Sequence, residues 1–257
     1  MSSGQASQLG RFCWIELITN DVSNAVTFYS KLWGWKTNAM DDSGAFQVLQ
    51  LGEEAFGATY ALPQQLQDLG VTPRWLNYVA VNSAQETADR IVDIGGSILM
   101  GPLAVGDAGV MALAKDPEGA TFALWQAKQH YGSLPVNSAG HYCWQELACR
   151  DLSSTLAFYQ KVFGWELSYR ESAMGQVPLF CVEQSPVASV IQMNEEWGDM
   201  AAHWMTYFAS SDVDADLTQV NTLGGDVCVP GFDIPEVGRI AVVNDPQGVV
   251  LSLLQAS

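Results

Sequence analysis

The feature that most constrains this chain is an internal repeat. One segment begins at Phe12 and reads FCWIELITNDVSNAVTFYSKLWGW, and another begins at Tyr142 and reads YCWQELACRDLSSTLAFYQKVFGW. A second pair of matching segments follows at 75–126 and 204–255, each with the order W-x2-Y, Gly-Gly, Asp-Pro-x-Gly and Gln. A duplication over most of the chain predicts two similar halves that contain the same internal parts.

Each half is itself predicted to contain two modules. Residues 12–18 alternate as a strand does, and Asp21 can cap a following helix that Gly34 can end. Three short strand-like runs follow, and the order strand, helix, three strands recurs later in the same half. We therefore predict an α+β fold of four βαβββ modules in two tandem domains, at 11–126 and 141–257.

The charge of the chain limits its partners. Eleven basic residues stand against 28 acidic ones, for a formal net charge of −17. A field of this sign repels nucleic-acid phosphates and anionic lipid, so we expect neither nucleic acid nor a membrane as a partner. No apolar run approaches the ~18 residues of a membrane span, and residues 1–10 lack the basic and apolar regions of a signal peptide. Five cysteines without a CxxC spacing fit a reducing compartment, so we predict a cytoplasmic protein.

Two of the repeated segments together resemble a known superfamily. The first is D-[VL]-x-x-[AT]-x-x-F-Y-x-x-x-[WF]-G-W, which starts at Asp21 and again at Asp151, shortly after a predicted strand. The second is the run VGRIAVVNDPQG, which ends at Gly248 and has a sister that ends in DPEG at Gly119. In this order, and twice, they resemble the vicinal oxygen chelate superfamily, which includes glyoxalase I, bleomycin-resistance proteins and extradiol dioxygenases. The nearest pattern is the two-domain subgroup of predicted enzymes related to lactoylglutathione lyase.

The resemblance implies that paired modules form a cup-shaped, eight-stranded mixed sheet whose concave face holds a divalent metal and the substrate. In metal-binding members, ligands stand seven residues before each helix start and seven residues after the Asp of the DPxG turn. The corresponding residues of this chain are Trp14, Leu76 and Ala123 in the first half, and Trp144, Met205 and Ser252 in the second. The last ligand would lie on strands at 56–62 and 187–193, which contain no His, Asp or Glu. Because a divalent ion needs several N, O or S ligands, we expect no metal site and no cofactor.

Strand alternation predicts which residues line the concave face instead. It places Trp14 with Glu16 on one strand, and Trp144 with Glu146 on its equivalent. The same parity adds residues from the other strands, so that the candidate ligand-binding residues are Trp14, Tyr78, Trp125, Trp144, Tyr207 and Ser252. A wall that is apolar with a few polar groups is typical of a small-molecule pocket. The alternative for the tryptophans is that they only fill the space of a lost metal.

Glu16 and Glu146 are the candidate catalytic residues. A carboxylate among aromatic side chains loses hydration, so its pKa should rise. It could act as a general base, anchor a cationic or hydroxylated ligand, or serve as a lone metal ligand. The alternative is a structural glutamate that is hydrogen-bonded to a tyrosine or to a backbone amide.

Other segments carry smaller expectations. His130, in the linker between the halves, and His141, at a strand entrance, are expected on the solvated surface. The glycine-containing runs 101–109 and 230–238 are predicted as loops, which either arch over the cup mouths or are plain surface connections.

Three functions fit these residues. The first is a metal-free small-molecule binding protein that resembles the bleomycin-resistance branch. The second is a metal-independent or atypical lyase or isomerase that uses Glu16 or Glu146 as base on a small carbonyl or aromatic compound. The third is a metal-dependent glyoxalase or dioxygenase. The sequence leaves open whether the chain is an enzyme and whether module one pairs with module two or module four, and we expect a monomer or a weak homodimer.

Overall fold

The structure, a computed structural model, describes residues 8–40, 44–172 and 175–257. Residues 1–7 lie outside the described residues. They make up most of residues 1–10, the stretch that lacks the features of a signal peptide.

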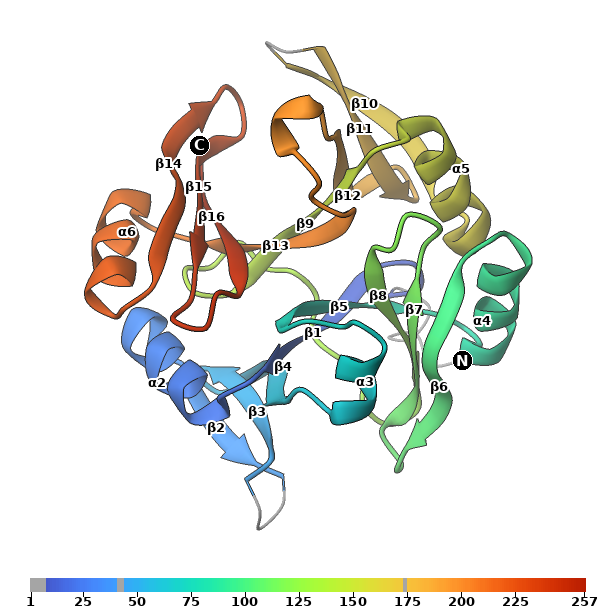
Figure 1. Ribbon diagram of the computed structural model, residues 1–257, viewed down its shortest axis with the longest axis horizontal. Helices are drawn as coiled ribbons and strands as arrows, with labels where there is room; N and C mark the ends of the chain where they lie inside the picture. The colour runs from blue at the N-terminus through green and yellow to red at the C-terminus, as the bar shows by residue number, and fades with distance from the viewer. Residues whose placement is uncertain (1–7, 41–43, 173–174) are drawn as a thin grey trace. The chain divides into compact units, whose positions relative to one another are not determined.

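The chain contains four modules with the same element order (Figure 1). The first comprises β1 (Phe12–Thr19), α2 (Val22–Trp33), β2 (Lys36–Ala39), β3 (Phe46–Leu51) and β4 (Glu54–Ala61). After the short helix α3 (Gln64–Asp68), the second comprises β5 (Arg74–Ala80), α4 (Ala84–Asp93), β6 (Ser97–Val105), β7 (Gly109–Lys115) and β8 (Thr121–Ala127). The third comprises β9 (Tyr142–Cys149), α5 (Leu152–Phe163), β10 (Glu166–Ser172), β11 (Gly175–Val182) and β12 (Ser185–Gln192). After the 3-10 turn η1 (Glu195–Trp197), the fourth comprises β13 (His203–Ala209), α6 (Val213–Thr222), β14 (Asp226–Ile234), β15 (Gly238–Asn244) and β16 (Val250–Ala256). The predicted α+β fold of four βαβββ modules is confirmed.

The repeated motif forms a helix because it encodes both helix ends. Asp21 and Asp151 each accept a hydrogen bond from the backbone N–H three residues later, and so cap α2 and α5. Gly34 and Gly164 end these helices in the left-handed region, at φ 73° and 72°, where a side chain would be strained. Between the two ends, the Phe-Tyr pair of each motif is buried.

The strands form two eight-stranded mixed sheets. Their strand orders are β2-β3-β4-β1-β5-β8-β7-β6 and β10-β11-β12-β9-β13-β16-β15-β14. β1 runs parallel to β4 and β5 runs parallel to β8, whereas the hairpin pairs are antiparallel. Each sheet therefore takes its strands from two consecutive modules, so strand pairing joins module one with module two.

Most of the two runs predicted as loops, 101–109 and 230–238, belongs to strands. They lie in β6 and β14, which end the strand orders of the two sheets. Register shifts interrupt the pairing of both strands, near Gly101 in β6 and near Phe232 in β14. An end strand tolerates proline because its outer N–H needs no partner, and bulges absorb extra residues. The loop prediction is therefore wrong for these runs, except for the turns that close the two hairpins.

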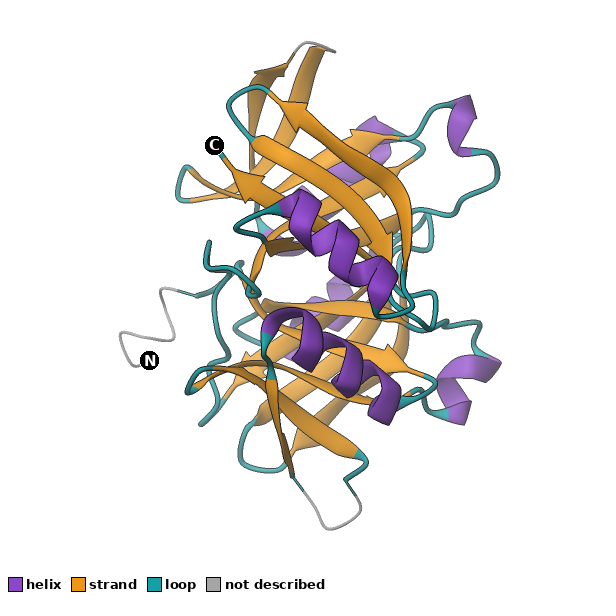
Figure 2. Ribbon diagram, turned by 90° about the vertical axis from the view of Figure 1, so that its left-hand side faces the viewer, coloured by secondary structure: helices purple, strands orange, loops and turns teal. Residues whose placement is uncertain are grey.

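The chain packs into two compact units, each of which takes one module from each half. Unit 1 consists of the described residues of 1–14, 77–134 and 145–204, and unit 2 of those of 15–76, 135–144 and 205–257. In unit 1, α4 packs against α5, and in unit 2, α2 packs against α6 (Figure 1). Figure 2 shows α2 and α6 side by side on the outside of the strands of unit 2. This division cuts across the two halves of the sequence, whose boundaries at 11–126 and 141–257 remain a prediction.

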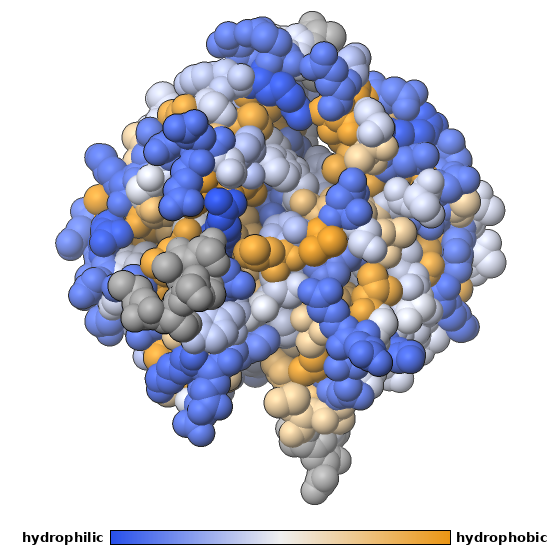
Figure 3. Space-filling view, turned by 180° about the vertical axis from the view of Figure 1, so that it is seen from behind, coloured by the Kyte–Doolittle hydropathy of each residue, from blue (hydrophilic) through white to orange (hydrophobic). Residues whose placement is uncertain are grey.

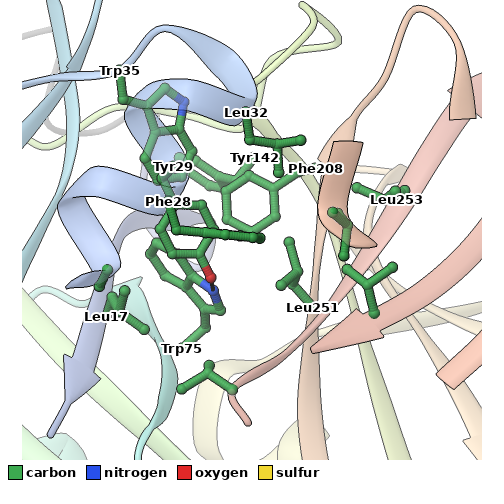
Figure 4. Packing of buried hydrophobic residues seen from close by; sticks show 14 of the residues in the cluster. Leu17, Phe28, Tyr29, Leu32, Trp35, Trp75, Tyr142, Phe208, Leu251 and Leu253 are labelled. Atoms are coloured by element: carbon green, nitrogen blue, oxygen red, sulfur yellow. Dashed lines mark hydrogen bonds between the residues drawn. The ribbon is translucent and has the colours of Figure 1, made fainter. Parts of the chain in front are cut away.

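The core of unit 2 fills the space between its two helices and the strands behind them (Figure 4). α2 contributes Phe28, Tyr29 and Leu32, and β16 contributes Leu251 and Leu253. Aromatic rings stack at its centre, where Tyr29 lies 4.9 Å from Trp35 with an interplanar angle of 15°. Such offset-stacked pairs add about 0.5–1.5 kcal/mol beyond the burial of their area.

The orientation of β1 follows from this core. Ile15 and Leu17 belong to it, and both are fully buried. Because successive side chains of a strand point to opposite faces, Trp14 and Glu16 lie on the face away from the helices. This is the parity that the sequence predicted, and we call this surface the helix-free face of the sheet.

A buried chain of three hydrogen-bonded side chains recurs in both units. In unit 2, Trp75 Nε1 donates to Tyr29 Oη at 3.3 Å, and Tyr29 Oη donates to Asp245 Oδ2 at 3.3 Å. In unit 1 the equivalents are Trp204, Tyr159 and Asp116, at 2.9 and 3.1 Å. Burial raises the pKa of Asp116 to about 6 and raises the pKa of Asp245 as well. Each chain joins the motif tyrosine of one half to the DPxG aspartate of the other half.

Candidate functional site

In unit 1, the helix-free face is aromatic. Phe122 of β8 packs on Tyr159 of α5 at a ring distance of 5.5 Å, so alternation places Trp125 on the face away from the helix. Tyr78 of β5 is in register with Ala123 of β8, on that same face. The rings of Tyr78 and Trp125 lie 6.4 Å apart at 80°, and both residues are buried. The structure thus brings together two of the predicted ligand-binding residues.

Trp14 joins this group through a histidine. The ring of His130 lies 4.6 Å from the ring of Trp14, at 89°, and 6.0 Å from the ring of Trp125. Trp125 Nε1 also donates to the backbone oxygen of His130 at 2.8 Å. Burial lowers the pKa of His130, which favours the neutral imidazole. We call Trp14, Tyr78, Trp125 and His130 the aromatic site of unit 1.

The expectation that both histidines lie on the solvated surface is wrong. His130 is half-buried in the aromatic site, and His141 is only 2 % exposed. In unit 2, the ring of His141 lies 4.9 Å from that of Phe56. No local pattern in the sequence marks either histidine, because Trp14 and Phe56, whose rings contact them, come from distant segments of the chain.

The two candidate catalytic glutamates have different neighbours. In unit 1, Glu146 is half-buried, and its Oε2 accepts a hydrogen bond from Ser189 Oγ at 2.7 Å. Ser189 is in register with Glu146 on the parallel strand β12. In unit 2, Glu16 is 8 % exposed, and the residue in register with it on β4 is Ala58. The carboxylate of the second half therefore has a hydroxyl donor at a place where the first half has a methyl group.

In unit 2, three further predicted residues lie on the helix-free face. Tyr207 of β13 is in register with Ser252 of β16, and their neighbours Phe208 and Leu253 belong to the helix-side core. Ser252 is fully buried, and among the described residues its Oγ has no hydrogen-bond partner. Trp144 of β9 is half-buried, in contrast to the buried Trp14 of the first half.

The outer surface offers less. The side of the molecule shown in Figure 3 is mostly hydrophilic, with small apolar patches. Two surface hollows, of about 440 Å³ in unit 2 and about 210 Å³ in unit 1, include none of the predicted site residues in their linings. No helix in the described part of the chain is long and apolar enough to cross a membrane.

Comparison with known proteins shows the family. The model of the Glyoxalase/Bleomycin resistance protein/Dioxygenase superfamily matches residues 11–124 and 138–253. The chain belongs to this superfamily, as its repeated motifs predicted.

Two relatives cover nearly the whole chain. CFP32 of Mycobacterium bovis, whose name proposes a glyoxylase, is 36% identical over 249 residues, which are 94% of this chain and 93% of that protein. DauV of a Streptomyces species, named an anthracycline biosynthesis protein, is 27% identical over 260 residues, which are 96% of this chain and 93% of that protein.

Solved structures share the fold at low sequence identity. The Mn(II)-bound glyoxalase from Novosphingobium aromaticivorans has a TM-score of 0.64 and 13% identity, over 96% of this chain and 82% of that one. Homoprotocatechuate 2,3-dioxygenase from Brevibacterium fuscum has a TM-score of 0.64 and 12% identity, over 96% and 81%. These likenesses concern the fold alone.

The residues at the positions that the resemblance assigns to metal ligands include no imidazole and no carboxylate. They are Trp14, Leu76 and Ala123 in one half, and Trp144, Met205 and Ser252 in the other. Within residues 8–40, 44–172 and 175–257, no three His, Cys, Asp or Glu side chains gather in a group that could hold a metal ion. Structural and catalytic metal sites need three or more protein ligands, so a single carboxylate is a poor substitute for such a set of ligands.

Proposed function

We propose that the chain is a small-molecule binding protein of the glyoxalase/bleomycin-resistance type, in which apolar and aromatic residues replace the metal ligands of its relatives. The helix-free face of each sheet is the binding face. The observation that carries this proposal is the aromatic site of unit 1, where Trp14, Tyr78 and Trp125 converge on a face that in metal-binding relatives would carry ligands. Aromatic walls with a few polar groups are what small-molecule pockets commonly present.

The ligand class favoured by these residues is planar and aromatic, with a hydroxyl or amino group. Edge-to-face and offset contacts with Trp and Tyr rings each add about 0.5–1.5 kcal/mol for an aromatic ligand. Ser252 Oγ, buried without a partner among the described residues, supports a ligand that supplies a hydrogen bond. The name of DauV, an anthracycline biosynthesis protein, supports the same class. The protein is further proposed to be cytoplasmic and a monomer or a weak homodimer.

The test is a fluorescence titration with the anthracycline doxorubicin. Because the chain carries a net charge of −17 and doxorubicin is a cation, salt of about 0.3 M is needed to screen nonspecific attraction. Trp144→Leu should weaken saturable binding about tenfold, or ~1.4 kcal/mol. Trp197→Leu, in the half-buried turn η1, is the matched control and should leave it unchanged. Binding that is not saturable, or that Trp144→Leu leaves intact, contradicts the proposal.

A second candidate function is a metal-independent lyase or isomerase that uses Glu146 or Glu16 as base. The hydrogen bond from Ser189 to Glu146 supports it, because it holds a carboxylate on the binding face, and the name of CFP32 points to carbonyl chemistry. Turnover of small dicarbonyl compounds that Glu146→Gln abolishes and exposed Glu195→Gln retains would favour this enzyme. A pH–rate profile that follows the ionisation of a single carboxyl group should accompany it. A stoichiometric transition metal in elemental analysis would favour the third candidate, a metal-dependent glyoxalase or dioxygenase.

A further inference from the structure

We propose that residues 128–133 of the linker are a built-in occupant of the aromatic site of unit 1. The His130 ring takes the place of a ligand ring, and an external ligand enters only when this segment is displaced. This inference rests on the proposed function, since it assumes that the helix-free face binds ligands.

The first support is the way the imidazole is held. Its ring meets the ring of Trp14 at 4.6 Å and nearly at a right angle, which is the edge-to-face geometry of a bound aromatic group. The ring of Trp125 lies 6.0 Å from the imidazole, at 73°. The indole N–H of Trp125 is engaged too, because it donates a hydrogen bond to the His130 carbonyl oxygen and not to an external ligand.

The second support is that backbone hydrogen bonds hold both ends of residues 128–133 in place. The backbone N–H groups of Lys128 and His130 both donate to the oxygen of Ala108, at 2.9 and 3.1 Å. At the other end, Ser133 N donates to Cys13 O at 2.7 Å. Cys13 immediately precedes Trp14, so this bond holds the segment beside the floor of the aromatic site.

The third support is a glycine that this path requires. Gly132 has φ +82°, and a Cβ at this position would overlap the carbonyl oxygen of Cys13. Only glycine allows the linker to lie this close to β1 in this conformation. The linker sequence is therefore adapted to lie along the strand rather than to hang free.

The equivalent tryptophan of the second half is more exposed. Trp144 is half-buried where Trp14 is buried, and Leu254 stands at the position equivalent to Trp125. The two binding faces are thus unequal, and the wild-type protein should bind a ligand first on the face that carries Trp144.

The test removes the imidazole ring of His130 by mutation and then supplies an imidazole as a free small molecule. In His130→Gly, 4-methylimidazole should bind saturably, raise the Tm and shift the indole N–H resonance of Trp125. His203→Gly removes a half-exposed histidine in the same unit and should not respond. In His130→Gly, the second doxorubicin should also bind more tightly than it does in the wild type. Absence of saturable 4-methylimidazole binding that is specific to His130→Gly overturns the inference.

A measurement on the wild type covers the case in which His130→Gly does not fold. Hydrogen exchange at the amides of Lys128 and His130 should speed up when doxorubicin occupies the site of unit 1 at saturating concentration. Doxorubicin bound in the second stoichiometric step without faster exchange overturns the inference. If doxorubicin binds neither protein while 4-methylimidazole binds His130→Gly, the proposed function fails and the occupancy of the aromatic site by His130 stands.

Discussion

Ser252→Ala is expected to stabilise the protein, whereas the same substitution at Ser189 is expected to destabilise it. Both serines are buried on the helix-free face, at 0% and 2% exposure. Ser189 Oγ donates to the Glu146 carboxylate at 2.7 Å. Ser252 Oγ has no partner among the described residues, although its strand is flanked on both sides by β13 and β15. The pair therefore isolates the effect of one hydrogen bond at matched burial and matched change of volume.

The sizes follow from the two environments. A buried hydroxyl without a partner costs about 1–3 kcal/mol of desolvation, which alanine removes at a small loss of contact. Ser252→Ala should therefore raise the free energy of unfolding by about 1–2 kcal/mol. A hydrogen bond to a charged group contributes about 1.5–3 kcal/mol, so Ser189→Ala should lower the free energy of unfolding by roughly that amount.

Urea unfolding at 25 °C measures both changes as shifts of the midpoint at an unchanged m-value. In thermal unfolding each kcal/mol corresponds to about 2–4 °C for a chain of this size. Ser252→Ala should also weaken doxorubicin binding, because the hydroxyl is proposed as a polar contact of the ligand. A Ser252→Ala protein that is less stable than the wild type refutes the reasoning, since the hydroxyl would then be hydrogen-bonded, for example to a buried water.

Three further predictions follow from the described contacts. Gly132→Ala should lower the free energy of unfolding by about 2 kcal/mol or more in urea, because the new Cβ overlaps Cys13 O at a positive φ; a neutral result would show that the linker does not lie on β1. Tyr159→Phe should lower the free energy of unfolding by about 1–3 kcal/mol, because it breaks the buried series of hydrogen bonds. Tyr169→Phe, at an exposed tyrosine, should change the free energy of unfolding by no more than about 0.5 kcal/mol. Asp116→Asn should remove a pH dependence of stability. The pKa of Asp116 is raised from 3.8 to about 6, so its stabilising contribution is present below pH ~4 and is lost as the pH rises to about 6. The stability of the wild type relative to Asp116→Asn should therefore fall over that range, and a rise would contradict the direction of the shift.

Local signals in the sequence suffice for the parts that depend on neighbouring residues. Asp21 and Gly34 mark both ends of α2 by their own chemistry, and alternation alone places Tyr78 and Trp125 on one face of their strands. The position of His130 has no such local cause. It depends on backbone bonds to Ala108 in a hairpin turn and on the indole of Trp14, both of which are distant in the sequence, so no window of sequence around His130 could reveal it. The continuation of β6 over 101–105 was missed for a related reason, because the proline next to Gly101 is a breaker in isolation and is tolerated only at the end of a sheet.

The contacts within the two units explain which residues are the same in both halves of the sequence. Each buried chain needs a tyrosine from one half and an aspartate from the other, as in Tyr159 with Asp116 and Tyr29 with Asp245. Neither half can lose its tyrosine or its aspartate without leaving a buried polar partner unpaired in the other, so both halves keep both. On the helix-free faces no such mutual requirement is seen among the described residues. There the halves share a Trp, a Glu and a Tyr on their central strands but differ at other positions, with Trp125 against Leu254, Ala123 against Ser252 and Ala58 against Ser189. On the helix side of the sheets, each residue of a buried hydrogen-bonded series is thus constrained by a partner in the other half. The helix-free side was freer to change. That is where two ligand sites of unequal shape and polarity are expected from one duplicated fold.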